Sequence, residues 1–273
     1  PTVRYRVEVL SPQAHLFAIT LEIDHPTPRQ RLSLPVWIPG SYLVREFSQH
    51  LQHLQATQGG EPVPLRQLDK NSWQVTADAG QALVLRYEVY AFDASVRTAF
   101  LDSTRGFFNA TSLCLRVLGQ EDLPHALELA PAPALSDWQV ATGLTPHRVD
   151  AQGFGQYLAE NYDELADCPV EMGAFWSASF TAAGVEHRFV VSGAGAWMDG
   201  QRLLEDVRRI CETQIAFWHD DGAPRGLGHK ARIAAARRAT ASMSWSQLVT
   251  RRISPGAGSR ARSRTLATSA LKA

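Results

Sequence analysis

The chain has 273 residues, of which 45% are hydrophobic and 20% are charged, and its formal net charge is zero. This composition excludes a disordered or fibrous protein, and the length is sufficient for one large domain or two ordinary ones. The zero net charge is the sum of an acidic region and a basic region of the chain. All 27 acidic residues precede residue 225, whereas 11 of the 27 basic residues lie in residues 225–273.

The apolar residues are spread too thinly to form a membrane span. No run of about 18 apolar residues is present, and no signal-peptide h-region is seen. The default expectation is therefore a cytoplasmic protein without a membrane partner. The chain begins at Pro1 rather than Met, which leaves open that it is a fragment whose leader is missing.

The cysteines Cys114, Cys168 and Cys211 are far apart in the sequence and form no C-x-x-C pair. Their number is odd, so a complete set of internal disulfides is not possible. This pattern predicts three buried thiols rather than a disulfide framework or a cysteine zinc site.

Alternation of apolar and polar residues with a period of two predicts strands through the first part of the chain. In the first strand, Val3–Leu10, the apolar side chains of Val3, Tyr5 and Val7 share one face. Tyr42–Leu54 is predicted as a short helix. Turns such as Gly59-Gly60 separate the remaining predicted strands, which are Leu16–Ile23, Arg31–Ile38, Ser72–Ala77, Leu83–Phe92, Phe107–Val117, Ala126–Leu129 and Trp138–Thr142. Such short strands favour a mainly β fold, with an antiparallel β-sandwich or saddle-like sheet over residues 1–168.

A second region is predicted to begin after Cys168-Pro169. Phe175–Phe180 and His187–Ser192 are typical of a strand pair with Ala183-Gly184 in the turn. A helix is predicted over about Met198–Trp218, capped by Asp199. Its apolar face is predicted to comprise Leu203, Leu204, Val207, Ile210, Cys211, Ile215 and Trp218. Residues 169–224 therefore indicate the opening β-β-helix part of a second, α+β domain that is incomplete by itself.

Residues 225–273 form a basic tail of low complexity that contains no acidic residue. Some helix is possible over Ala231–Val249, but the composition indicates disorder, most clearly from Ser254 onward. The cations would attract phosphate groups. However, the tail carries no nucleic-acid motif and no aromatic residue besides Trp245, so a nucleic-acid partner is not expected.

The most specific stretch of the sequence is Val36–Phe47, which reads V-W-I-P-G-S-Y-L-V-R-E-F. Pro39 fixes its own φ and lacks an N–H, and Gly40 permits positive φ, so a strand must end or bend at this point. Trp37 is expected in the core. Behind the turn follow an aromatic residue, a cation and an anion, which is unusual for a loop.

This stretch resembles the W-x-P-G-S-Y-x-x-R-[DE]-F signature of the glycyl-aminopeptidase family of zinc metallopeptidases. Further segments are similar in the same order over residues 1–224. They are Arg105–Thr111 (R-G-F-F-N-A-T), Tyr162–Gly173 (Y-D-E-L-A-D-C-P-V-E-M-G) and Gly184–Gly193. The resemblance implies an N-terminal β domain followed by a thermolysin-like catalytic domain and usually a PDZ domain. It also implies a zinc cofactor in the full-length protein and a peptide substrate with an N-terminal glycine or other small residue.

The zinc motif of that family is absent from this sequence. The family's chemistry needs H-E-x-x-H on a helix, where histidines at i and i+4 hold the metal and the glutamate acts as base. None of the nine histidines lies in such a motif. His50 and His53 form an H-x-x-H pair without a glutamate, which favours a polar edge over a metal site. His187, between Val185 and Phe189, is expected to be a half-buried histidine and not a ligand.

The tail also departs from the family where the substrate cleft is expected. Arg225–His229 (R-G-L-G-H) resembles the family's G-G-L-E-H segment but lacks its glutamate. Our hypothesis is that the tail is an out-of-frame or truncated product of a GC-rich gene. The sequence therefore predicts no metal ligand and no catalytic residue in this chain.

Substrate-binding candidates are Asn109, Tyr42, Arg45 and Glu46. The last three are expected to face the catalytic cleft of a full-length relative. Alternatively, Arg45 and Glu46 lock the turn against the sheet through charge-assisted hydrogen bonds. Asn109 offers a neutral acceptor for the ammonium group of a substrate, or else it is a strand residue bonded to the backbone. Asn109-Ala-Thr111 is also a glycosylation sequon, whose use depends on the compartment.

Two functions remain open for this chain. In the first, it is the N-terminal portion of a zinc-dependent aminopeptidase and is inactive as it stands, so whether it is itself an enzyme is undecided. In the second, it is a non-catalytic β module that binds peptides or proteins, aided by the basic tail.

Overall fold

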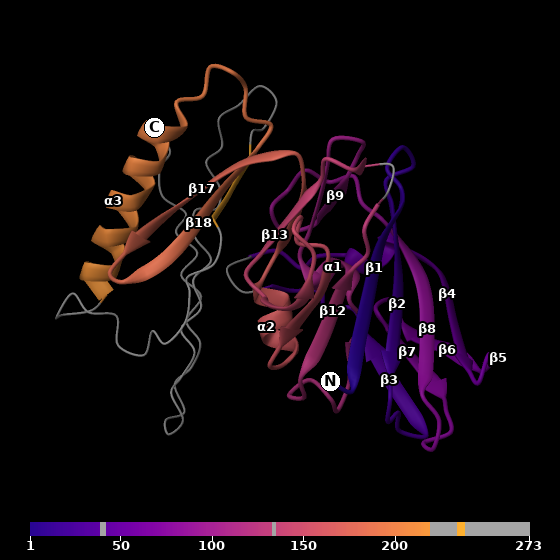
Figure 1. Cartoon of the computed structure of the whole chain (residues 1–273). Coiled ribbons are helices and arrows are strands. Elements are labelled where there is room, and N and C mark those ends of the chain that lie inside the picture. Colours follow the sequence, from indigo (N-terminus) through magenta and orange to yellow (C-terminus); the bar gives the residue numbers. More distant parts are fainter. Residues whose placement is uncertain (39–41, 133–134, 219–233, 238–273) are drawn as a thin grey trace. The chain divides into compact units, whose positions relative to one another are not determined.

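The computed structural model describes residues 1–38, 42–132, 135–218 and 234–237 (Figure 1). It is mainly β, as the sequence predicted. The chain divides into two compact units, which are described separately. The first comprises Pro1–Val140 with Leu144–Gly173, and the second comprises Ala141–Gly143 with the described residues from Ala174 onward. Within the described residues, no helix is long and apolar enough to cross a membrane.

The first unit is built from short strands with a few helical turns. Its elements in chain order are β1 (Val3–Ser11), β2 (Leu16–Ile23), β3 (Arg29–Ser33), η1 (Phe47–His50), β4 (Leu51–Gln58), β5 (Glu61–Pro62), β6 (Leu65–Asp69), β7 (Ser72–Thr76), β8 (Leu83–Tyr90), β9 (Ala99–Leu101), β10 (Arg105–Phe108), α1 (Ala110–Leu113), β11 (Arg116–Val117), β12 (His125–Leu129), β13 (Gln139–Thr142), β14 (Thr145–Val149), β15 (Gly155–Ala159), α2 (Tyr162–Asp167) and β16 (Val170–Gly173).

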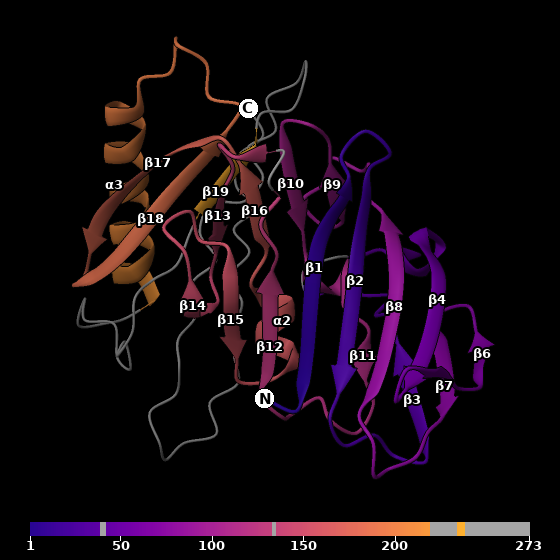
Figure 2. The same cartoon turned by 45° about the vertical axis from the view of Figure 1, so that its right-hand side comes forward.

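The largest sheet of this unit runs β14-β15-β12-β1-β2-β8-β4-β5 within the described residues (Figure 2). β1 pairs antiparallel with β2 and parallel with β12. Side chains point alternately to the two faces of each central strand, and one face is buried. The buried residues of β1 include Val3, Tyr5 and Val7, as the sequence predicted. The same holds for β8, where the buried residues are Leu83, Leu85, Tyr87 and Val89.

Two smaller sheets follow the orders β11-β3-β7-β6 and β13-β16-β10-β9, and the last two residues of β13 belong to the second unit. Their buried side chains, among them Leu32, Val75 and Phe108, belong to the same core as those of the large sheet. Sheets that share one core in this way form the predicted β-sandwich.

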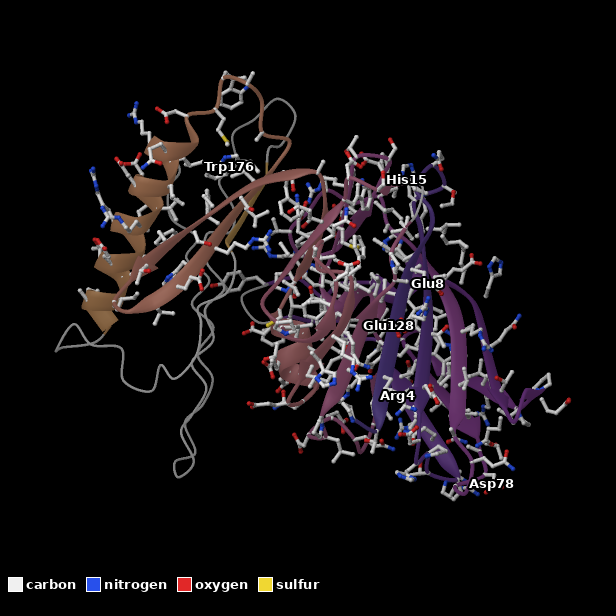
Figure 3. All side chains as sticks on the ribbon, in the orientation of Figure 1. Arg4, Glu8, His15, Asp78, Glu128 and Trp176 are labelled. Carbon is white, nitrogen blue, oxygen red and sulfur yellow. The ribbon has the colours of Figure 1, made fainter. Side chains whose placement is uncertain are left out.

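The outer face of the large sheet carries ion pairs between neighbouring strands. Arg4 pairs with Glu22 at 2.8 Å and with Asp24, and Arg6 on β1 pairs with Glu128 on β12. Figure 3 labels Arg4 and Glu128 on this sheet. These side chains are between 30% and 43% exposed. Each pair therefore adds at most about 1 kcal/mol of stability and mainly keeps this face soluble.

Two predicted elements of the first unit were wrong. The helix over Tyr42–Leu54 is instead the short 3₁₀ turn η1 followed by strand β4. The long strand Phe107–Val117 is instead β10, the helical turn α1 and the short β11. In both segments the apolar residues are dense enough to fit the helical period of 3.6 residues as well as the strand period of two. Tertiary packing therefore decides between helix and strand.

The segment after β3 also differs from prediction. β3 ends at Ser33 and not at Ile38, and Trp37, expected in the core, is 53% exposed. The predicted turn at Pro39-Gly40 lies outside the described residues. By contrast, Gly59 and Gly60 have φ of +57° and +90°, which confirms the turn between β4 and β5.

The second unit contains β17 (Phe175–Ala182), β18 (Val185–Ser192), α3 (Gly200–Trp218) and β19 (Ala234–Arg237). β17 and β18 form the predicted antiparallel pair, joined through Ala183 and Gly184, both with positive φ. In Figure 1, α3 lies alongside this pair. Its buried residues Val207, Cys211 and Ile215 share a small core with Phe189. Ile210, which we predicted on this face, is instead 48% exposed.

The beginning of α3 is fixed by two local features. The Asp199 carboxylate accepts a hydrogen bond from the Arg202 backbone N–H at 3.0 Å, which confirms the predicted cap. A Cβ at Gly200 would approach the Trp176 ring to 2.6 Å, so only glycine permits this close approach (Figure 3). The helix is therefore anchored at its first turn to β17.

The predicted basic tail falls almost wholly outside the described residues, and its disorder stays a prediction. The exception is Ala234–Arg237, which is strand β19 and pairs in parallel with β18. A helix had been considered possible over Ala231–Val249, so that interpretation is wrong for these residues.

Candidate functional site

The candidates Tyr42, Arg45 and Glu46 lie on the segment that connects β3 to η1. Tyr42 is completely exposed, and its neighbours Leu43 and Val44 are each more than 60% exposed. A run of exposed apolar residues is uncommon on a protein surface and often marks a contact site.

The charged residues of this segment connect it to other parts of the first unit. The Arg45 backbone N–H donates to the Val36 carbonyl at 2.6 Å, which closes the loop at its base. The Glu46 carboxylate accepts from the Lys70 ammonium group at 2.6 Å, in the turn between β6 and β7. The bracing interpretation therefore has direct support for Glu46, through Lys70.

The fourth candidate, Asn109, lies between β10 and α1 and is only 8% exposed. Its side-chain amide donates to the Val96 carbonyl at 2.8 Å and, more weakly, to the Thr98 carbonyl at 3.5 Å. These bonds fasten the loop before β9 to the end of β10. Because Asn109 and Thr111 are both buried, the sequon is inaccessible to a glycosyltransferase in the folded chain.

The candidates lie on neighbouring elements. α1, which follows Asn109, packs against η1, which follows Glu46. The sequence therefore selected two segments that meet in space, although no direct contact joins Asn109 to Tyr42 among the hydrogen bonds and ring contacts of the described residues.

The end of α1 is held by a cluster of buried tyrosines that the sequence analysis missed. Tyr87 donates to the Leu113 carbonyl at 2.8 Å, Tyr162 to the Cys114 carbonyl at 2.8 Å and Tyr5 to the Leu115 carbonyl at 2.7 Å. The carbonyl groups at a helix end lack partners within the helix. Here hydroxyls from β1, β8 and α2 supply those partners. Burial raises the pKa of all three tyrosines well above their ordinary value, so they remain neutral donors.

A buried ion pair was also missed. The Arg105 guanidinium contacts the Glu171 carboxylate at 2.7 Å, and their side chains are 15% and 3% exposed. The guanidinium also lies over the rings of Phe100 and Phe107, at 5.5 and 5.9 Å from their centroids. Arg105 and Glu171 belong to two different segments that carried the family resemblance. β10 and β16 bring those segments together as paired strands, and only the strand pairing reveals this contact.

The described residues do not fit a zinc site. The His50 ring lies 6.1 Å from that of Tyr90 at a tilt of 40°, whereas His53 contacts the Glu88 carboxylate at 3.0 Å, so the two histidine rings have different partners. Within the described part of the chain, no three His, Cys, Asp or Glu side chains converge as a metal site requires. His187 is buried, and its Nδ1 lies 3.0 Å from the Val185 carbonyl oxygen. The three cysteines are free and buried, as predicted.

Asn109→Ala is expected to lower the free energy of unfolding by about 1–3 kcal/mol, because the Val96 carbonyl loses its buried donor. Urea denaturation followed by circular dichroism measures this. Asn71→Ala is the matched control, since Asn71 donates to the Leu34 carbonyl at 2.9 Å from a less buried position, and a smaller loss is expected. An Asn109→Ala variant as stable as the unchanged chain would show that the hydrogen bond from Asn109 to the Val96 carbonyl does not stabilise the fold.

Comparison with known proteins identifies the first unit. Residues 4–174 match the family model described as the peptidase M61 N-terminal domain. A crystal structure described as an aminopeptidase N family protein from Idiomarina loihiensis is similar, with 38% sequence identity and a TM-score of 0.77. The match covers 86% of this chain but only 38% of that protein.

More distant similarity extends to an M1 zinc metallopeptidase from Deinococcus radiodurans, at 11% identity and a TM-score of 0.47. That match covers 91% of this chain and 59% of the other, and no argument rests on so low a score. A comparison with curated proteins finds no match. The family match spans well over half of the chain, including β1, α1 and the Arg105–Glu171 pair. The chain therefore belongs to the family of proteins that carry the peptidase M61 N-terminal domain.

Proposed function

We propose that this chain is the N-terminal portion of a zinc-dependent aminopeptidase that removes glycine or another small residue from the N-terminus of peptides. The observation that carries the proposal is the match of residues 4–174 to the peptidase M61 N-terminal domain. The Idiomarina loihiensis protein of the aminopeptidase N family supports it, because its sequence is 38% identical over most of this chain.

In this proposal the first unit binds and orients the substrate, and residues outside this sequence carry out the hydrolysis. The sequence contains no H-E-x-x-H, and the described residues supply no metal ligands. No hydrolytic step is therefore assigned to residues of this chain, and zinc belongs to the parent protein. Its role there is to activate water for attack on the first peptide bond.

The exposed Tyr42 and Glu46 are the residues best placed to meet a peptide. The Glu46 side chain is paired with Lys70 but 45% exposed, so its carboxylate can also meet a substrate ammonium group. Tyr42 offers an aromatic face to an apolar side chain. Asn109 then contributes by fixing the loop at Val96–Thr98 rather than by direct contact, because it is only 8% exposed.

The test is a peptidase assay on the purified chain with glycyl and alanyl p-nitroanilides in the presence of zinc. No release is expected, with or without a chelator. Chelator-sensitive release would overturn the claim that the reacting groups lie elsewhere. Binding of a glycyl peptide without turnover, lost in Tyr42→Ala and Glu46→Gln, would support substrate binding by the first unit.

The coding DNA gives an independent test of the parent activity. We infer that reading the locus beyond codon 225 in all frames reveals an H-E-x-x-H segment, because the acid-free composition of residues 225–273 departs from the rest of the chain. A verified locus without such a segment in any frame would contradict the aminopeptidase proposal. Peptide binding by such a chain would then favour a non-catalytic module.

A further inference from the structure

His125 occupies a completely buried position in the first unit. It is the first residue of β12 and is 0% exposed. β12 lies between β1 and β15, where His125 is in register with Val3 on one side and Ala159 on the other. Both flanking partners are apolar, so the neighbouring strands offer the ring no charged group at these positions.

Two members of the tyrosine cluster enclose the His125 ring. Tyr5 stacks on it, with centroids 6.0 Å apart and planes within 9°, and Tyr162 meets it edge-on at 5.9 Å. These are the tyrosines whose hydroxyls hold the carbonyls of Leu115 and Cys114. The ring therefore supports the side chains that attach the segment after α1 to β1 and α2.

The surroundings of the second ring nitrogen of His125 favour an uncharged ring. Nδ1 lies 2.6 Å from the Leu123 carbonyl oxygen, so Nδ1 carries the hydrogen and donates it. Nε2 is buried and has no hydrogen-bond partner. A proton added at Nε2 would create a buried cation with an unpaired donor, which is costly in a protein interior.

The groups around the ring offer little compensation for such a charge. Tyr5 on β1, Tyr162 on α2 and Cys114 are all neutral because burial raises the pKa of each. Burial lowers the pKa of His125 and outweighs the hydrogen bond to the Leu123 carbonyl and the charge of Glu121, before β12, which both act to raise it. The other charged groups on the packed elements are Arg116 on β11 and Asp163, Glu164 and Asp167 on α2, and Glu128 on β12 itself. Arg4, Arg6 and Glu8 on β1 alternate with its buried residues Val3, Tyr5 and Val7.

We propose that His125 is an acid-sensitive latch whose protonation at Nε2 opens the contacts of Tyr5 and Tyr162 and frees the segment Leu113–Leu115. The proton comes from solvent when the local structure opens, and the opened state keeps it. Because α2 leads directly into β16, this opening also loosens the segment that connects the first unit to the second.

Acid is expected to favour the opened state by a calculable factor. An exposed histidine has a pKa near 6.5. If the closed state takes up no proton at Nε2, lowering the pH from about 7.5 to about 5 raises the population of the opened state by about 30-fold. If the closed state also takes up some proton at Nε2, the population of the opened state still rises in acid, but by a smaller factor.

Cys114 is a built-in reporter of this opening, because it is fully buried between the tyrosines. The experiment treats the full chain with dithiodipyridine at about pH 7.5 and about pH 5. Peptide mass spectrometry quantifies each labelled cysteine, normalised to the denatured chain at the same pH. Labelling of Cys114 is expected to rise by up to about 30-fold in acid. Labelling of Cys211, in the second unit, is expected to change far less.

His125→Phe keeps an aromatic ring but binds no proton, so the acid-induced rise at Cys114 is expected to disappear. His147→Gln, at an exposed position on β14, is the control and should retain the rise. If His125→Phe does not fold, His125→Gln serves the same purpose. Equal labelling of Cys114 at both pH values, or the same rise in the His125 variant, would overturn the proposal.

Discussion

Arg105→Met is expected to lower the free energy of unfolding by about 3–5 kcal/mol, because it leaves the Glu171 carboxylate buried beside an apolar side chain. Glu171 is 3% exposed and lies 2.7 Å from the guanidinium. The methionine retains apolar contact with Phe100 and Phe107. The expected loss of stability therefore comes mainly from the buried Glu171 charge and not from lost packing.

Urea denaturation of the purified chain measures this change. The control is Arg208→Met, which removes an exposed pair with Glu212 on α3 and is expected to change stability by no more than about 0.5 kcal/mol. Arg105→Met combined with Glu171→Leu is expected to recover much of the loss, because no buried charge then remains. A double variant as unstable as the single one would show that the pair contributes through shape instead.

Gly155→Ala is the second substitution with a large expected effect. It is expected to lower the free energy of unfolding by at least about 3 kcal/mol. Gly155 has φ of +128°, and a Cβ there would lie 2.1 Å from the Arg148 carbonyl oxygen. That oxygen belongs to backbone in β14, beside the register shift between β14 and β15. The clash therefore cannot be relieved by rotating a side chain.

Gly60→Ala provides the matched comparison for Gly155→Ala. Gly60 also has positive φ, at +90°, but no atom lies within 4 Å of its hypothetical Cβ. Gly60→Ala is expected to lower the free energy of unfolding by about 1 kcal/mol, from backbone strain alone. Thermal unfolding of the two variants separates the clash from the strain. Equal destabilisation would mean that the β14–β15 edge rearranges freely around an added methyl group.

The strands of the large sheet were predictable because one buried face imposes a period of two. Leu16–Ile23 was predicted with its observed bounds, and Val3–Leu10 differs from β1 by one residue. The cap at Asp199 and the turn at Ala183-Gly184 were also predictable, since each depends on residues adjacent in sequence.

Features that depend on distant residues were not predictable. Trp37 satisfies every local criterion for a core residue, yet the chain after β3 leaves the sheet and exposes it. The candidate Asn109 was chosen for its amide, but its burial and its bond to Val96 come from tertiary packing. The partners Arg105 and Glu171 are 66 residues apart, and nothing in either local sequence indicates the other.

The cluster at Leu113–Leu115 has a consequence for the order in which this protein is made. Tyr5 is synthesised 110 residues before its acceptor at Leu115. Tyr162, the donor to Cys114, follows another 48 residues after its acceptor. β1 likewise waits for its parallel partner β12. The first unit therefore cannot complete its core until nearly all of it has been synthesised, which makes its folding late and slow.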